Sequence, residues 1–98
     1  MLPSERLHIH REEILEILGR YPRLSNLRVV GSVARGEDTE DSDIDFFVDT
    51  APEATYFDIG GLYNELENLL GIPFDIIISG DHLHENMKMT IEKDARAI

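Results

Sequence analysis

The spacing of apolar residues along the chain predicts three amphipathic helices. The first extends from Ser4 to Gly19, with apolar side chains recurring at helical spacing and a glycine at its end. The second begins at the start signal Thr55-x-x-Asp58 and closes at Gly71, and the same spacing predicts a last helix beyond residue 79. The apolar positions that define these helices are, in order, Leu7, Ile14, Leu15 and Leu18; Ile59, Leu62, Tyr63, Leu66, Leu69 and Leu70; and Leu83, Met87 and Ile91.

Short runs of β-branched and aromatic residues predict strands between the helices. In the central run, Asp43, Asp45 and Phe47 alternate with three large apolar residues, so the two sets are expected on opposite faces of a strand. A Gly-Ser turn precedes this run, and a single helical turn is expected at residues 33–36. The predicted strands are Leu27–Val30, Asp43–Val48 and Phe74–Ile78, with a further short edge strand at Ala95–Ile98.

This order of elements predicts an α/β (α+β) fold, a small mixed sheet of three to four strands flanked by helices. The helices are expected to cover one face of the sheet and to leave open the face that carries the aspartates. A chain of 98 residues is large enough for one hydrophobic core, so residues 1–98 are expected to form a single domain.

Composition narrows the classes of partner. Twenty acidic residues against nine basic ones give a formal net charge of −11, which disfavours nucleic acid because no basic patch interrupts it. The acidity favours divalent cations or a basic protein partner, although it serves solubility equally well. No apolar run is long enough to span a membrane, no signal peptide is recognised, and the chain has no cysteine. A cytoplasmic location is therefore expected.

Three aspartates are the candidate metal ligands. Asp43 and Asp45 share one face of a strand, and Asp75 stands in an apolar run where a carboxylate is costly without a partner. If the two strands are neighbours, the three carboxylates converge and can hold two Mg²⁺ ions, which prefer oxygen ligands. The alternative is that Asp43 caps a turn, Asp45 is solvated and Asp75 lies on an edge strand.

The Gly31-Ser32 turn supplies the other half of a candidate nucleoside triphosphate site. Glycine lets the backbone approach a phosphate closely, and the Ser32 hydroxyl with the following amides can bind phosphate oxygens. Taken alone, the dipeptide is better explained as an ordinary turn glycine followed by a serine that caps a helix.

The string GSVARGEDTEDSDIDFFVD at Gly31–Asp49 resembles the motif of the DNA polymerase beta-like nucleotidyltransferase superfamily. In that motif, Gly-Ser, ten residues and Asp-x-Asp precede a third aspartate on a later strand, here Asp75. The longer form, with Ala-Arg-Gly after the turn and Ser-Asp-Ile-Asp before apolar residues, resembles the minimal nucleotidyltransferase branch. The resemblance covers essentially the whole chain and implies the polymerase beta-like fold.

The resemblance implies a role for each matching residue. Gly31 and Ser32 would hold the triphosphate of the incoming nucleotide, and Asp43 and Asp45 would bind the magnesium ions that carry it. Asp75 would share the second ion and help to activate the attacking hydroxyl. These three aspartates are thus the expected catalytic and metal-binding residues, and ATP is the expected substrate.

Arg35 matches the Ala-Arg-Gly of the family pattern. It would contact a phosphate or fix the loop, and an ion pair with one of the neighbouring acids Glu37, Asp38 or Asp41 explains it equally well. Nucleotidyl transfer requires no covalent enzyme intermediate, which agrees with the lack of cysteine.

The resemblance also implies a partner. Minimal nucleotidyltransferases are typically encoded beside a helical ribonuclease toxin of the HEPN type, act as its antitoxin, and in some cases transfer AMP from ATP to a tyrosine of that toxin. The expected function is therefore that of an antitoxin and protein adenylyltransferase in a hetero-oligomer with the toxin. Two alternatives stay open: an antitoxin that blocks its partner by binding alone, and a small-molecule nucleotidyltransferase of the antibiotic-modifying kind.

Overall fold

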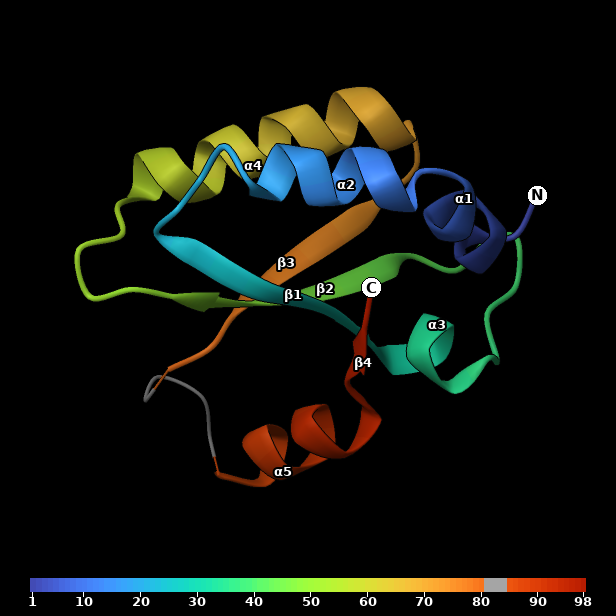
Figure 1. Ribbon diagram of the computed structural model, residues 1–98. Helices are drawn as coiled ribbons and strands as arrows, with labels where there is room; N and C mark the ends of the chain where they lie inside the picture. Colours follow the sequence, from blue (N-terminus) through green and yellow to red (C-terminus); the bar gives the residue numbers. More distant parts are fainter. Residues whose placement is uncertain (81–84) are drawn as a thin grey trace.

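The computed structural model describes residues 1–80 and 85–98 as a mixed four-stranded sheet with helices on both faces (Figure 1). The predicted α+β class with three to four strands is confirmed. In chain order, the elements are α1 (Pro3–Ile9), α2 (Arg11–Leu18), β1 (Leu24–Val30), α3 (Gly31–Arg35), β2 (Ile44–Thr50), α4 (Tyr56–Leu70), β3 (Phe74–Ile78), α5 (Glu85–Asp94) and β4 (Arg96–Ala97).

The strands lie in the order β3-β2-β1-β4. β1 is antiparallel to both β2 and β4, whereas β2 and β3 are parallel. Parallel neighbours need a long crossover, and α4 supplies it by returning the chain over one face of the sheet (Figure 1). β4 confirms the predicted edge strand in the tail.

The main core lies between the sheet and the helices α2 and α4. Ile44, Phe46 and Val48 project from β2 into this layer and are completely buried, as the alternation of the sequence predicted. Burying one such side chain contributes about 1.5–3 kcal/mol, so this face of β2 is a principal source of stability. The helical residues that meet it include Ile14 and Ile17 of α2 and Leu62, Leu66 and Leu70 of α4.

The opposite face of the sheet is partly covered, which corrects the expectation that it stays open. α5 lies under this face (Figure 1), and its Ile91 packs with Val30 and Phe47 in a second, smaller cluster. Ile77 of β3 and Ala95 pack against the same cluster. Phe47, which shares the face of Asp45, therefore belongs to a core and is only 5% exposed.

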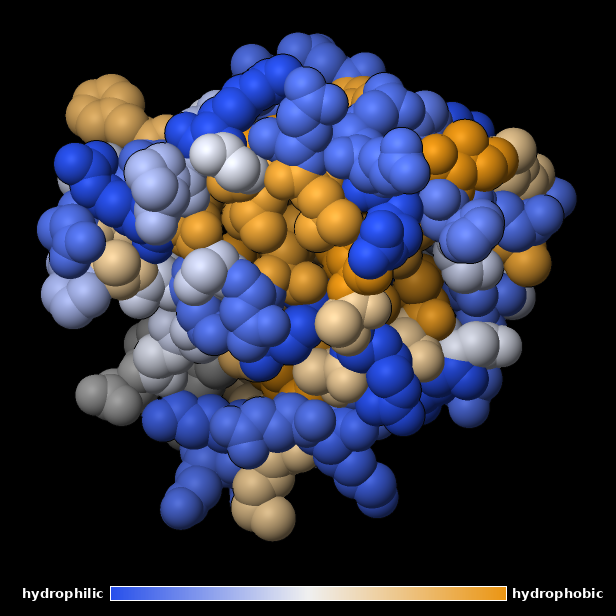
Figure 2. Space-filling view, viewed as in Figure 1, coloured by the Kyte–Doolittle hydropathy of each residue, from blue (hydrophilic) through white to orange (hydrophobic). Residues whose placement is uncertain are grey.

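The first predicted helix is two helices. His10, with φ −97° and ψ 11°, leaves the helical conformation and ends α1 before α2 begins at Arg11. In α2, Ile17 is buried and Leu15 is exposed, although the predicted apolar stripe contained Leu15. Side chains projecting from α2 and α4 give the upper surface a largely hydrophilic coat (Figure 2).

Several predicted boundaries shift. β1 begins at Leu24, before the predicted run, because the left-handed residue Asn26 (φ 53°) lies where the register with β2 is irregular, and the chain pairs on both sides of it. In α5, Ile91 is buried as predicted, but Met87 is 48% exposed and is not a core residue. Leu83, assigned to the same helical stripe, lies outside the described residues.

The predicted start of α4 is confirmed. The backbone N–H of Thr55 donates to Asp58 at 2.9 Å, which closes a capping box at the first turn. Gly61, a residue that weakens helix propensity, is explained by packing, since a Cβ atom there would lie 2.6 Å from the hydroxyl oxygen of Tyr21. Within residues 1–80 and 85–98, no helix has the length and apolar character needed to cross a membrane.

Candidate nucleotide and metal site

Asp45 and Asp75 lie directly opposite each other in the parallel ladder of β2 and β3. Because Ile44 and Phe46 point into the main core, Asp45 between them points to the other face, and its ladder partner Asp75 shares that face. The expectation that the two aspartate-bearing strands are neighbours is confirmed. β3 is also an edge strand of the described sheet, and Asp75 is exposed there.

Asp45 carries the electrostatic cost of the three predicted carboxylates. Burial raises the pKa of Asp45 above its ordinary value, and the negative charges of Asp75 and Asp43 raise it further. Asp45 is half-buried, whereas Asp43, just before β2, and Asp75 are exposed. A half-buried carboxylate flanked by two others is costly as it stands, and a cation would relieve that cost.

The donor set fits magnesium, although the carboxylates are not already closed around a point. Among the residues that the structure describes, no three acidic or histidine side chains stand in a ready-made ligand cluster. The donors are nevertheless all oxygens, which suit Mg²⁺, and the exposed carboxylates of Asp43 and Asp75 are free of core packing that would prevent them from turning toward Asp45.

Gly31 stands against the carboxylate of Asp45. Its φ is +73°, and a Cβ atom on it would lie 2.8 Å from Oδ2 of Asp45. Both the backbone conformation and the close approach require glycine. The Gly-Ser turn and the carboxylate of Asp45 therefore meet at one place in the fold.

Ser32 lies in the first turn of the short helix α3. The expected single helical turn is confirmed but begins at Gly31, with Val30 as its N-cap and no side chain capping it. The alternative in which Ser32 caps this helix is therefore wrong. The helix ends at Gly36, whose φ of +71° closes it in the left-handed conformation.

Arg35 bridges α3 to α5. Its Nε donates to Glu37 at 3.2 Å, which confirms one of the predicted ion pairs, and its Nη1 donates to Asp94 at 2.7 Å. The hydrogen bond to Glu37, followed by the one to Asp94, raises the pKa of Arg35. Asp94 could not be predicted as a partner, because that residue lies 59 positions away and becomes a neighbour only when α5 packs under the sheet.

A second polar group lies on the same face beyond Phe47. The guanidinium of Arg28 lies 4.2 Å from the centre of the Phe47 ring and forms an ion pair with Asp49. Burial alone would raise the pKa of Asp49, but hydrogen bonds from Asn26, Ser79 and Arg28 hold it below the ordinary value. This group fixes the far end of β2, and we assign it no part in the site.

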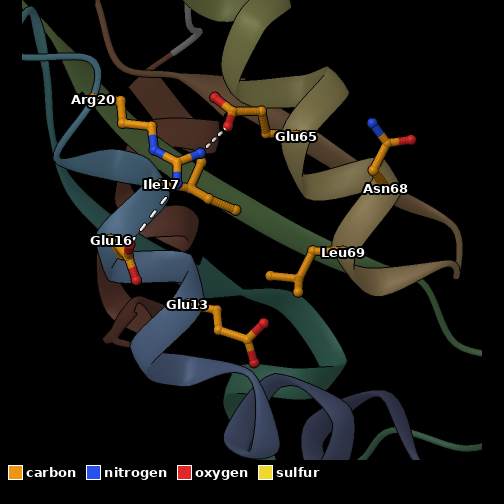
Figure 3. Close-up of a pocket in the computed structure, with 7 residues that line it drawn as sticks. All are labelled: Glu13, Glu16, Ile17, Arg20, Glu65, Asn68 and Leu69. Atoms are coloured by element: carbon orange, nitrogen blue, oxygen red, sulfur yellow. Dashed lines mark hydrogen bonds and ion pairs between the residues drawn. The ribbon is translucent and has the colours of Figure 1, made fainter.

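A groove of about 370 Å³ between α2 and α4 lies on the opposite face of the sheet. Figure 3 shows Arg20 between Glu16 and Glu65, so its charge is shared with the two helices that form the walls. Acidic, basic, amide and apolar side chains all line the groove, and the main core separates it from Asp45.

Comparisons with known proteins agree with this geometry. The sequence matches the model of the family described as "Nucleotidyltransferase domain" over residues 11–98. It is 35% identical, over 79 residues that span 81% of each chain, to a putative protein adenylyltransferase of Methanocaldococcus jannaschii.

Solved structures share the fold. One, of a putative minimal nucleotidyltransferase, superposes with a TM-score of 0.82 at 36% identity and covers 97% of this chain and 95% of that one. Another, described as a toxin-antitoxin with AMP-PNP, has a TM-score of 0.71 at 20% identity and covers 88% of this chain and 69% of that one, so it shows likeness of fold alone.

Proposed function

Because the chain belongs to the nucleotidyltransferase domain family, we propose that it transfers AMP from ATP to a tyrosine hydroxyl of a helical toxin of the HEPN type, and that it acts as the antitoxin of that toxin. The observation that carries the proposal is the position of Asp45, which lies opposite Asp75 in the ladder and against Gly31. Carboxylates for a cation and a glycine turn for phosphate are thus adjacent.

Each residue of the motif has a part in this proposal. The turn at Gly31 and Ser32 binds the triphosphate, and Asp43, Asp45 and Asp75 hold two magnesium ions. When bound, these ions neutralise charge on the phosphates and on the departing pyrophosphate. Asp45 is the anchor of the set because β2 holds it between two buried core residues.

The transfer forms one bond and breaks one. The acceptor oxygen bonds to the α-phosphorus of ATP, and the bond from that phosphorus to the oxygen bridging to the β-phosphate breaks, so pyrophosphate leaves with the bonding electrons. The hydroxyl proton passes to the carboxylate of Asp75, which is exposed and accessible to an incoming acceptor. Arg35 binds a phosphate oxygen after exchanging one of its carboxylate partners.

A protein acceptor is supported by the relatives and by charge. The Methanocaldococcus jannaschii relative is named as a protein adenylyltransferase, and a toxin-antitoxin structure containing AMP-PNP has the same fold. A net charge of −11 suits a basic partner protein in a hetero-oligomer and disfavours nucleic acid. With ATP as the substrate, we expect the reaction to take place in the cytoplasm.

The test is mass spectrometry of a co-expressed HEPN-type partner protein, after incubation with the purified protein, ATP and Mg²⁺. We expect AMP on a tyrosine of the partner, and we expect none with the double variant Asp43→Asn/Asp45→Asn. Asp41→Asn is the matched control, since it removes one exposed carboxylate from the same loop and should transfer normally.

Two outcomes would contradict the proposal. A partner that is inhibited without modification, equally by the wild type and by the double variant, would show an antitoxin that acts by binding alone. A double variant that fails to fold, judged by circular dichroism and Tm, would show that the aspartates are structural.

A further inference from the structure

An apolar hollow of about 340 Å³ lies between β3 and α5, on the face of the sheet that carries Asp45. Ile77, Met87 and Ile91 supply its apolar surface, and Asn86 and Thr90 contribute the polar atoms. Both polar residues are exposed, so the hollow opens to solvent along α5. Asn86 and Thr90, and likewise Met87 and Ile91, are four residues apart and so lie on one side of the helix.

The hollow adjoins the carboxylate site through β3. Asp75 and Ile77 are alternate residues of this strand, so their side chains project from the same face, about 6.6 Å apart along the strand. The ladder confirms this placement, because Asp75 is paired with Asp45 while Ile77 is paired with Phe47 and packs in its cluster.

The parts of the site follow one another across the sheet from β1 to β3. Gly31 follows β1, Asp45 is on β2, and Asp75 with the hollow is on β3, the outer strand. With the triphosphate at Gly31, the pyrophosphate leaves on the β1 side. An attacking oxygen in line with the leaving group must then approach from the β3 side, where the hollow lies.

We propose that this hollow is the acceptor subsite and that it takes the ring of a tyrosine presented by the partner protein. The proposal rests on the proposed function. Of the protein side chains with a hydroxyl, only tyrosine has a large apolar body with the hydroxyl at its tip. A ring seated over Ile77 with its hydroxyl pointing along the strand brings that hydroxyl toward Asp75, the alternate residue on the same face.

Met87 is the lining residue whose side chain can adjust to a bound tyrosine ring. It is 48% exposed, although the second core cluster lies beside it at Ile91 and Ile77. A methionine side chain is flexible and packs well against the edge or face of an aromatic ring. Its exposed position on α5 therefore suits a contact made only when an acceptor is present.

The first arm of the test measures binding without catalysis. With methyl-labelled methionine, the protein gives three methyl signals, and p-cresol is the probe for a tyrosine ring. We expect p-cresol to shift the Met87 signal and to leave that of Met89, which is 65% exposed on the same helix and does not line the hollow. ATP with Mg²⁺ should leave Met87 unshifted.

The second arm measures transfer, using Met87→Trp to fill the hollow and Met89→Trp as the matched control. We expect Met87→Trp to lower AMP transfer to a tyrosine acceptor at least tenfold while ATP affinity stays within twofold. Met89→Trp should behave as the wild type in both respects.

Three results would overturn the subsite. The first is a Met87 signal that moves with ATP but not with p-cresol, which would make the hollow the site of the base. The second is normal transfer by Met87→Trp, and the third is equal shifts of Met87 and Met89. If the wild type transfers no AMP at all, the proposed function fails, and the methyl shifts alone still decide whether the hollow binds a phenol ring.

Discussion

Arg35, at the end of α3, donates a hydrogen bond of 2.7 Å to Asp94 at the end of α5. This contact joins the element that carries the Gly-Ser turn to the helix under the sheet. It also occupies the side chain that we propose binds a phosphate oxygen of ATP. If Arg35 binds phosphate, replacing Arg35 and replacing Asp94 should change ATP affinity differently; if Arg35 is only a structural link, the two replacements should act alike.

If Arg35 exchanges Asp94 for phosphate, Arg35→Ala lowers ATP affinity at least tenfold. Asp94→Asn should leave ATP affinity within threefold, or raise it, because the competing carboxylate has been removed. Isothermal titration with ATP and Mg²⁺ measures both variants. Equal losses of ATP affinity in the two variants would instead show that Arg35 acts by holding α3 to α5 through Asp94.

Gly31→Ala should damage both the fold and the site. Alanine at φ +73° costs about 1–2 kcal/mol of unfolding free energy. Its Cβ would also lie 2.8 Å from Oδ2 of Asp45, so the carboxylate would have to move. We expect transfer to fall more than tenfold. Gly36→Ala is the matched control, because its φ is +71° and nothing lies within 4 Å of its Cβ, so it should lose similar stability and keep most activity.

The paired glycines of α4 should respond to alanine with opposite signs. Nothing lies within 4 Å of a Cβ at Gly60, so Gly60→Ala should stabilise the protein by about 0.5–1 kcal/mol through helix propensity. Gly61→Ala places its Cβ against the Tyr21 ring and should destabilise by about 1–3 kcal/mol. Urea unfolding of the two variants measures the contrast, and equal signs would refute the close packing of Tyr21.

The Asp49 carboxylate should make stability depend on pH below about 4. Its pKa is lowered in the fold, so its contribution is complete above the pKa of the unfolded chain and is lost as pH falls through the folded value. Asp49→Asn should therefore flatten the fall in Tm on acidification. Glu53→Gln, which removes an exposed carboxylate, should keep the slope of the wild type.

The sequence predicted those parts of the fold and site that depend on local spacing. Alternation placed Asp45 opposite the core, and Thr55-x-x-Asp58 located the start of α4, because both patterns are properties of neighbouring residues. The break at His10 escaped prediction because the apolar spacing on either side of it continues without interruption.

What depended on distant contacts could not be predicted. Asp94, the partner of Arg35, and the hollow between Ile77 and Met87 arise only when α5 folds under the sheet. No pattern among neighbouring residues predicts how α5 packs against the sheet. The exposure of Met87 escaped prediction for the same reason.

The pairing of Asp45 with Asp75 also constrains how β3 can be aligned during folding. If β3 slid along β2 by one residue, Phe74 or Ile76 would lie beside Asp45, and Asp75 would turn into the layer of Leu62, Leu66 and Leu70. A carboxylate in that layer would have no partner and would cost several kcal/mol. Asp75 thus penalises every misalignment by an odd number of residues. The acidic residue in this apolar strand therefore favours those alignments of β3 with β2 in which Asp75 lies on the same face as Asp45, as the site requires.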